Sequence, residues 1–199
     1  MEIHQKNFTE ELNRSNITYD YFTLGPDIYS TQKKYHQNPQ TRTLLSKEQL
    51  KHRYKKLIVK YAFRFLIPVK WWLKRKFHPN SIKKIEDKSN SPFVNEVVEN
   101  PMLHGSCYIF SKKFIDKYPN KCFYDKTFMY LEAEIFYYLA LKRNEKMIYY
   151  PFLMIDHHED VSTDVAYKKQ YEKSIFSIKC LLQSTKAFID LIEEEENEI

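Results

Sequence analysis

Two glutamates open an otherwise apolar and aromatic segment, "YLEAEIFYYLALKR", which runs from Tyr130 to Arg143. Glu132 and Glu134 stand at its front, and Lys142 and Arg143 stand at its back. This order suits the dipole of a helix, which favours anions at the N-terminus and cations at the C-terminus. It also suits a carboxylate that is held at the mouth of a helix to accept a proton. Because the two acids are two positions apart, we expect them to point to nearly opposite sides, one catalytic and the other structural.

A second candidate is "LHGSCYIF", in which His104, Gly105 and Ser106 precede an apolar strand. Glycine at that place allows a ligand to approach the backbone closely. A simple β-bulge would also explain it.

The third is "DHHED", from Asp156 to Asp160, at the end of an apolar strand. Carboxylates and imidazoles together suit a divalent metal or an anionic leaving group. A solvated turn that caps the next helix explains the acids equally well, but it leaves the paired histidines, His157 and His158, unexplained.

The fourth is a basic segment, Ser46 to Phe77. From Lys47 to Lys76 there are eleven Lys or Arg residues and one acid, Glu48. Three interpretations stand: phosphate contacts to a nucleic acid, an ordinary solvated helix, or a helix on an anionic membrane surface. Tryptophan beside lysine favours the membrane, and its candidate contacts are Lys55, Lys56, Lys60, Arg64, Trp71, Trp72, Lys74 and Arg75.

Composition excludes several classes. The 199 residues contain only two glycines, Gly25 and Gly105, so a P-loop or a glycine-rich dinucleotide fingerprint is impossible. The three cysteines have no paired metal spacing and indicate reduced thiols. The N-terminus has no apolar signal-peptide core, and no apolar run approaches the roughly 20 residues of a membrane span. We therefore expect a cytoplasmic protein.

These groups need elements to position them. The pattern predicts a strand from Tyr19 to Leu24 that ends at a turn over residues 25–27, followed by a polar loop. From Ser46, apolar residues recur at helical spacing until Pro68 kinks or ends the helix, and a shorter basic and aromatic helix follows.

A polar linker then leads to the second half of the chain. "GSCYIF" predicts a short buried strand, and Ser111 caps a small helix to Lys117. The Glu132 helix follows, then one or two strands broken at Pro151, and a long closing helix. Strands that alternate with helices predict an α/β or α+β protein. We divide it into a strand and loop (1–45), a basic helical insertion (46–78), a linker (79–96), a catalytic block (97–163) and a C-terminal helix with an acidic tail (164–199).

Four blocks in this order resemble the C-terminal half of bacterial family 2 glycosyltransferases, in the rhamnosyltransferase-like branch of the GT-A fold. They are "LGPDIYSTQKKYHQNP", "LHGSCYIFSKKFI", "TFMYLEAEIFYYLALKR" and "HHEDVSTD". The resemblance extends from about Ile3 to Glu194 and implies a partial GT-A-like mixed sheet flanked by helices.

The resemblance also implies roles. The second carboxylate of the family's acidic motif is the general base, and its position matches Glu134, with Glu132 as the substitute because Ala133 stands between them. The family's histidine matches His157, which would approach a metal or the donor diphosphate. His104, Gly105 and Ser106 would line the acceptor pocket.

The resemblance therefore implies an inverting, sugar-nucleotide-dependent transferase of cell-wall or polysaccharide biosynthesis, on the inner face of the cell membrane. The family's nucleotide-binding half has no counterpart upstream of Leu24, so we expect the acceptor-side half, or a fragment, that is inactive alone. In the intact enzyme Mg or Mn would assist, and this chain alone should bind neither tightly. A separate N-terminal half is a possible partner. The alternatives are a basic nucleic-acid-binding protein and a non-catalytic accessory module.

Overall fold

The computed structural model describes residues 1–77, 92–158 and 169–197. They form two compact units. We call residues 1–44, 92–124 and 132–158 the sheet unit, and residues 45–77, 125–131 and 169–197 the helical unit. The basic segment and the C-terminal helix, far apart in sequence, thus belong to one unit. The protein is a mixed α/β structure.

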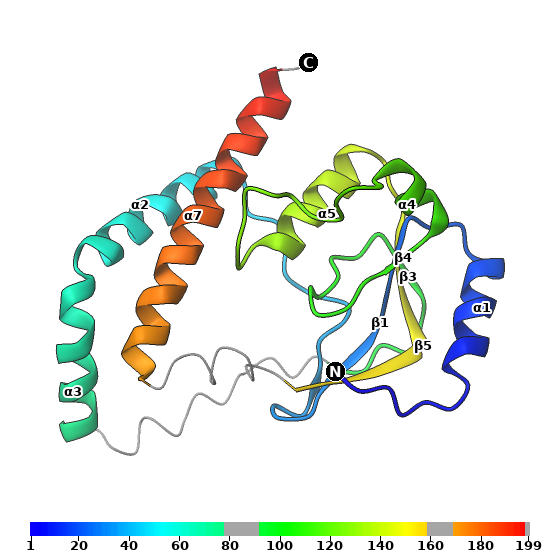
Figure 1. The fold of residues 1–199 in the computed structure, drawn as a ribbon, viewed down its shortest axis with the longest axis horizontal. Coiled ribbons are helices and arrows are strands. Elements are labelled where there is room, and N and C mark those ends of the chain that lie inside the picture. Colours follow the sequence, from blue (N-terminus) through cyan, green and yellow to red (C-terminus); the bar gives the residue numbers. More distant parts are fainter. Residues whose placement is uncertain (78–91, 159–168, 198–199) are drawn as a thin grey trace. The chain divides into compact units, whose positions relative to one another are not determined.

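The sheet unit is built on two long strands, β1 (Thr23–Ser30) and β5 (Met147–His157), which pair in parallel. Figure 1 shows them side by side at the centre of this unit. The sheet order is β2-β1-β5-β3, with β4 also paired to β1. The short strands β2 (Tyr35–His36), β3 (Val98–Glu99) and β4 (Ile109–Phe110) all pair antiparallel to the long ones.

Both long strands pass through a proline, which corrects two expectations. Residues 25–27 are not a turn, because β1 continues through them to Ser30, and β5 is one strand that is not broken at Pro151. The pairing register jumps from Pro26↔Tyr150 to Asp27↔Met154, so both prolines fall at one irregularity. Proline lacks the N–H that a sheet ladder needs, and a bulge is a place where it is tolerated.

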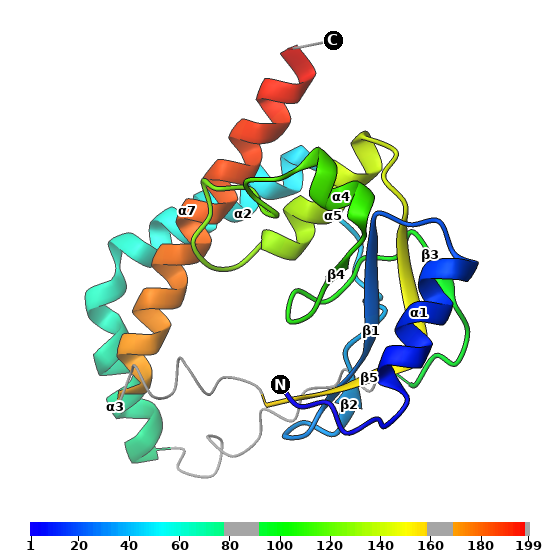
Figure 2. The same cartoon turned by 45° about the vertical axis from the view of Figure 1, so that its right-hand side comes forward.

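Helices cover both faces of this sheet. The helix α1 (Phe8–Thr18), which the sequence interpretation missed, packs through Phe8 and Leu12 on a core that includes Leu24. Figure 2 shows α1 against the long strands. The opposite core includes Phe136 of α5 (Glu132–Lys142) and Phe114 of α4 (Lys112–Lys117). The α5 helix begins at Glu132, and Ser111 caps α4, both as predicted.

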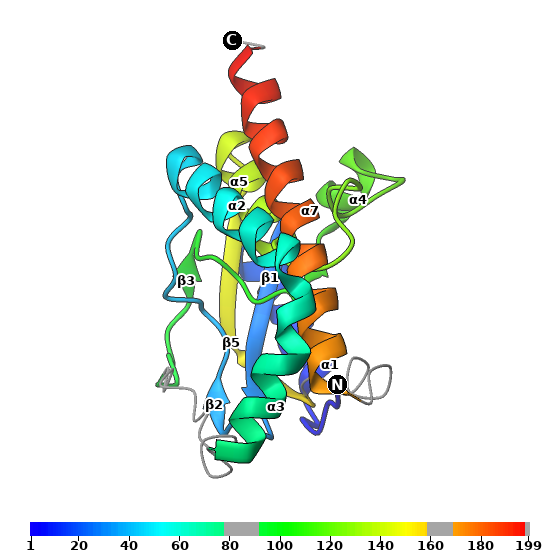
Figure 3. The same ribbon diagram turned by 90° about the vertical axis from the view of Figure 1, so that its left-hand side faces the viewer.

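The helical unit contains a bent arm that lies along one long helix. Ser46 caps α2 (Lys47–Ala62) in a full capping box with Gln49. A short 3₁₀ turn, η1 (Arg64–Leu66), leads into α3 (Ile67–Phe77). Figure 3 shows that α2 and α3 both lie beside α7 (Gln170–Asn197).

Three further expectations change in detail. The helix is interrupted at η1, before Pro68, which lies in the first turn of α3, where proline costs no helical hydrogen bond. Of "GSCYIF", only Ile109 and Phe110 form a strand, and both are half-buried. The polar loop after β1 contains β2. Most of the expected linker and the start of the expected closing helix lie outside the described residues.

Two absences hold for the described part of the chain. No helix in it is both long enough and apolar enough to cross a bilayer. No disulfide links its three cysteines, Cys107, Cys122 and Cys180.

Candidate functional site

The segment from His36 to Arg42 holds the candidate site together, although the sequence predicted only a polar loop there. Gln37 and Asn38 are buried, and each binds a residue from a distant part of the sheet unit. The Asn38 side chain donates to the Pro26 carbonyl over 2.8 Å and accepts the His104 backbone N–H over 2.6 Å. Asn38 therefore ties β1 to the turn that contains His104.

That turn is locally ordered around the imidazole of His104. The ring Nδ1 lies 2.7 Å from Ser106 Oγ and accepts the Ser106 backbone N–H over 3.3 Å. Because Nδ1 acts as an acceptor here, the proton of the neutral ring is on Nε2. The Nε2 atom of His104 is therefore a hydrogen-bond donor.

His157, at the end of β5, has the opposite polarity. Its Nδ1 lies 2.8 Å from Gln37 Oε1, an atom that can only accept, so Nδ1 carries the proton. In the neutral ring, Nε2 is then an acceptor, which is the state that binds a metal or takes a proton. The centres of the His104 and His157 rings are 5.8 Å apart. The fold thus brings together two histidines that are separated by 53 positions (157 − 104) in the sequence.

The N-terminus of α5 lies against the same turn. A Cβ added at Gly105 would be 3.6 Å from the Cβ of Ala133, which is ordinary van der Waals contact. Ala133 stands between the two candidate carboxylates. The predicted catalytic and acceptor residues therefore meet within the sheet unit.

The two carboxylates differ in their surroundings. Burial raises the pKa of Glu132, a hydrogen bond from its own backbone N–H partly offsets this rise, and the Glu134 carboxylate adds a smaller increase. Glu134 Oε1 lies 3.7 Å from Arg42 Nη1. The pKa of Tyr108 is raised by burial first and then by both glutamates, so both carboxylates lie near this ring. Both acids therefore contribute to the electrostatic environment of the Tyr108 ring.

The backbone before α5 is unusual. Tyr130 and Leu131 have φ angles of 69° and 68°, in the left-handed region. Such a conformation costs a non-glycine residue roughly 1–3 kcal/mol and persists where the surroundings enforce it. The Tyr130 hydroxyl lies 2.8 Å from Ser177 Oγ within the helical unit, and this contact helps to fix the entry to the helix.

A buried acid–imidazole pair was missed because residues 25–27 were interpreted as a turn. Asp27 is 2% exposed, and its two carboxylate oxygens each lie 2.9 Å from His36 Nδ1. Burial raises the pKa of Asp27, and the bonds from His36 partly offset that rise. Since a carboxylate only accepts, His36 donates from Nδ1. In the sequence, the only signal was that Asp27 and His36 belong to one predicted strand-and-loop region. The pairing of β1 with β2 brings their side chains together.

The remaining predicted residues are more dispersed. His158 Nδ1 lies 3.0 Å from Thr31 Oγ1, and its Nε2 lies 3.5 Å from Glu2. Glu159 and Asp160 of the acidic motif lie outside the described residues. Within the described ranges, no three His, Cys, Asp or Glu side chains are grouped to hold a metal ion.

The predicted membrane contacts all belong to the helical unit. Lys55, Lys56, Lys60, Arg64 and Trp72 are exposed, whereas Trp71 is half-buried and lines a groove between α3 and α7. Lys74 and Arg75 are part of α3, but their side chains are not among those described.

No protein-family model, curated protein or solved structure matches this chain.

Proposed function

We propose that the sheet unit is the acceptor side of an inverting, sugar-nucleotide-dependent glycosyltransferase with a GT-A-like fold. The observation that carries the proposal is the contact between the His104–Ser106 turn and the N-terminus of α5, beside His157. Hydrogen-bond donors and acceptors beside a carboxylate of raised pKa suit a sugar hydroxyl that must be both oriented and deprotonated.

Glu132 is the better general base of the two glutamates. Burial raises its pKa towards neutrality, and a base with a pKa nearer the working pH takes a proton more effectively. Glu134, the base that the family resemblance implies, lies 3.7 Å from the Arg42 guanidinium, measured from Oε1 to Nη1. We assign Glu134 and Arg42 to positioning and to the electrostatics of the pocket.

The proposed reaction forms one bond and breaks one bond at the anomeric carbon. The acceptor hydroxyl gives its proton to Glu132 while its oxygen attacks the anomeric carbon from the face opposite the leaving group. The bond from that carbon to the diphosphate oxygen breaks, and the nucleoside diphosphate leaves with the electron pair. His104 donates from Nε2 to a neighbouring sugar hydroxyl, and Ser106 and Gly105 complete the acceptor wall.

Sugar binding tests this proposal directly. Saturation-transfer NMR of the chain with a panel of simple glycosides should show transfer to one or a few of them. His104→Ala and Glu132→Gln should weaken that signal by about an order of magnitude, which is the loss expected for one or two hydrogen bonds to a ligand. The matched controls are His52→Ala on α2 and Glu10→Gln on α1, which are both exposed.

Catalysis is tested separately. Release of nucleoside diphosphate from sugar nucleotides is followed with Mg²⁺ or Mn²⁺ and the bound glycoside, for the chain alone and with candidate donor-side proteins. Sugar binding that never supports transfer in any combination would identify an accessory module. A chain that binds no glycoside in the panel would contradict the proposal.

A further inference from the structure

An exposed apolar stripe runs along the outside of the bent arm in the helical unit. On α3, Val69, Trp72, Leu73 and Phe77 are spaced at i, i+3, i+4 and i+8, which places them on one helical face. Their side chains are 42–62% exposed. Apolar residues at this spacing normally face a core. Here the described part of the helical unit leaves them open.

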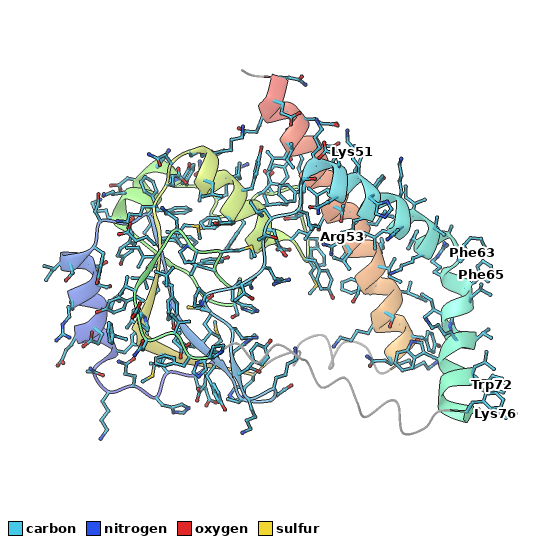
Figure 4. All side chains as sticks on the ribbon, turned by 180° about the vertical axis from the view of Figure 1, so that it is seen from behind. Lys51, Arg53, Phe63, Phe65, Trp72 and Lys76 are labelled. Carbon is cyan, nitrogen blue, oxygen red and sulfur yellow. The ribbon has the colours of Figure 1, made fainter. Side chains whose placement is uncertain are left out.

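The stripe continues through the bend. Phe63 and Phe65 are 55% and 64% exposed, and their ring centres are 6.1 Å apart. Figure 4 shows Phe63, Phe65 and Trp72 along the outer edge of the bend and α3. The side of α3 towards α7 borders two grooves of about 740 and 470 Å³; Trp71 lines both, whereas Trp72 lines only the first. Trp71 is half-buried and Trp72 is exposed, so Trp71 is the more enclosed of the two adjacent tryptophans.

Positive charge accompanies this stripe, but not evenly. Lys47 and Lys51 at the start of α2 pair with Glu193 and Glu196 at the end of α7, so their charge is largely neutralised. Lys60 and Lys70 are exposed along the arm, and Lys76 Nζ lies 5.1 Å from the Trp72 ring centre. Exposed lysines therefore extend from Lys55 and Lys56 on α2 through the bend to α3, beside the exposed aromatic side chains.

We propose that this face docks on an anionic lipid bilayer, with α3 parallel to the surface. Phe63, Phe65, Trp72 and Phe77 enter the boundary between headgroups and acyl chains, and Lys60, Lys70 and Lys76 contact lipid phosphates. Apolar and aromatic side chains on one face with lysines beside them characterise helices that lie in a membrane interface. A nucleic acid would use the lysines but offers no acyl region for a stripe of this length. The inference concerns the helical unit and does not depend on sugar transfer.

Vesicle flotation of the full chain tests the charge requirement. The chain should float with vesicles of phosphatidylcholine and phosphatidylglycerol, and binding should fade as salt rises. Lys70→Gln with Lys76→Gln should weaken binding roughly 25-fold, at about fivefold for each charge near such a surface. Lys47→Gln with Lys51→Gln changes the net charge equally and should have little effect. Equal binding to pure phosphatidylcholine, or no binding to anionic vesicles, would contradict the proposal.

Fluorescence tests which face enters the lipid. Trp71→Phe leaves Trp72 as the only tryptophan, and Trp72→Phe leaves Trp71. Anionic vesicles that contain brominated lipid should quench Trp72 strongly and Trp71 much less. Equal quenching, or quenching of Trp71 alone, would overturn the assignment of the face.

A further pair of substitutions distinguishes lipid from two other partners of this face, a nucleic acid and a second copy of the chain. Phe65→Ser with Trp72→Ser should reduce vesicle binding at least about tenfold, since two large apolar side chains no longer leave water. Ile17→Ser, at an 87% exposed site on α1, is the control. If the chain binds duplex oligonucleotides more tightly than vesicles, and the double variant still binds them, the partner of the lysines is a nucleic acid and not lipid. If light scattering shows a dimer and the double variant is a monomer, the face binds a second copy of the chain and not lipid.

Discussion

At the level of single residues, the burial of Glu132 distinguishes two roles of a carboxylate at a helix N-terminus, which are to complement the helix dipole and to accept a proton. A carboxylate that only complements the helix dipole stabilises the fold by about 0.3–1 kcal/mol. Glu132 has a pKa that burial and Glu134 raise, so its ionisation opposes folding. A titratable group whose pKa is raised by burial and by a neighbouring charge is a candidate functional residue.

We predict that Glu132→Gln increases the free energy of unfolding at pH 7. The folded-state pKa of Glu132 is raised, so its favourable contribution is full below the unfolded pKa and is lost as pH rises through the folded pKa. The advantage of glutamine should therefore be largest at neutral pH and vanish near pH 4. Urea unfolding at several pH values measures it, with Glu10→Gln as control. A variant that is less stable than the parent at pH 7 would support the dipole role instead.

The same substitution should damage catalysis. In an active combination with a donor side, Glu132→Gln should lower kcat by about two to four orders of magnitude, the range for loss of a general base. Glu134→Gln should cost less, because we assign Glu134 to positioning. The reverse order would reinstate Glu134 as the base.

Gly25 and Gly105 differ in the space available for a Cβ atom, so alanine substitutions at the two positions can be compared. A Cβ at Gly25 would lie 2.6 Å from Leu103 Cδ2, and Leu103 is fully buried, so it has no room to move. Gly25→Ala should lower the free energy of unfolding by about 1–3 kcal/mol, as overpacking does. Gly105→Ala has space and should change stability by less than about 0.5 kcal/mol. It should nevertheless weaken glycoside binding, which NMR measures on the same samples.

At the level of elements, the segment after β1 has the widest influence on the site. His36, Gln37 and Asn38 follow one another, and they bind Asp27, His157 and the His104 turn respectively. A short strand and the residues after it thus position groups from three distant parts of the sheet unit. This segment, and not the histidines alone, positions the groups of the proposed site.

Asn38→Ala tests this role. The change removes the bonds to the Pro26 carbonyl and to the His104 N–H, and it leaves both backbone groups without that partner. We expect a loss of about 1–3 kcal/mol in the free energy of unfolding, together with weaker glycoside binding. Asn7→Ala at the exposed start of α1 is the control, since its side chain makes no capping bond. Unchanged stability in denaturant titration would mean that the bridge has little energetic weight.

At the level of the whole molecule, the two candidate surfaces belong to different compact units. The proposed sugar site is built from the sheet unit, and the proposed lipid face from the helical unit. Their energetics should therefore be separable, because substitutions with no shared partners usually have independent effects.

We predict that His104→Ala and Glu132→Gln leave vesicle flotation unchanged within about twofold, which corresponds to roughly 0.4 kcal/mol. Conversely, Phe65→Ser with Trp72→Ser should leave glycoside binding in solution unchanged. Cross-effects larger than about tenfold in either direction would show that the two surfaces are coupled.

The elements that the sequence alone determined are those with a local cause. Ser46 and Gln49 form a capping box, Ser111 caps α4, and α5 begins at its first glutamate, because neighbours within one helical turn decide helix starts. The mixed α/β class and the helical character of residues 170–197 follow from periodicity in the same way. The candidate residues of the site were also visible as unusual residue types at strand and helix ends.

Tertiary structure decided what depends on partners distant in sequence. From the local sequence, residues 25–27 were interpreted as a turn and Pro151 as a break in a strand. Both segments are strands, because the parallel pair of β1 and β5 accommodates the two prolines at one irregularity in its register. Pairing of β1 with β2 placed His36 opposite Tyr29, two residues from Asp27, so that the ring reaches the Asp27 carboxylate, and Asn38 brought the His104 turn to β1. Adjacent Trp71 and Trp72 were alike in the sequence, but packing against α7 left Trp71 half-buried and Trp72 57% exposed. Burial and register are properties of the whole chain, because each depends on which distant segments pack together.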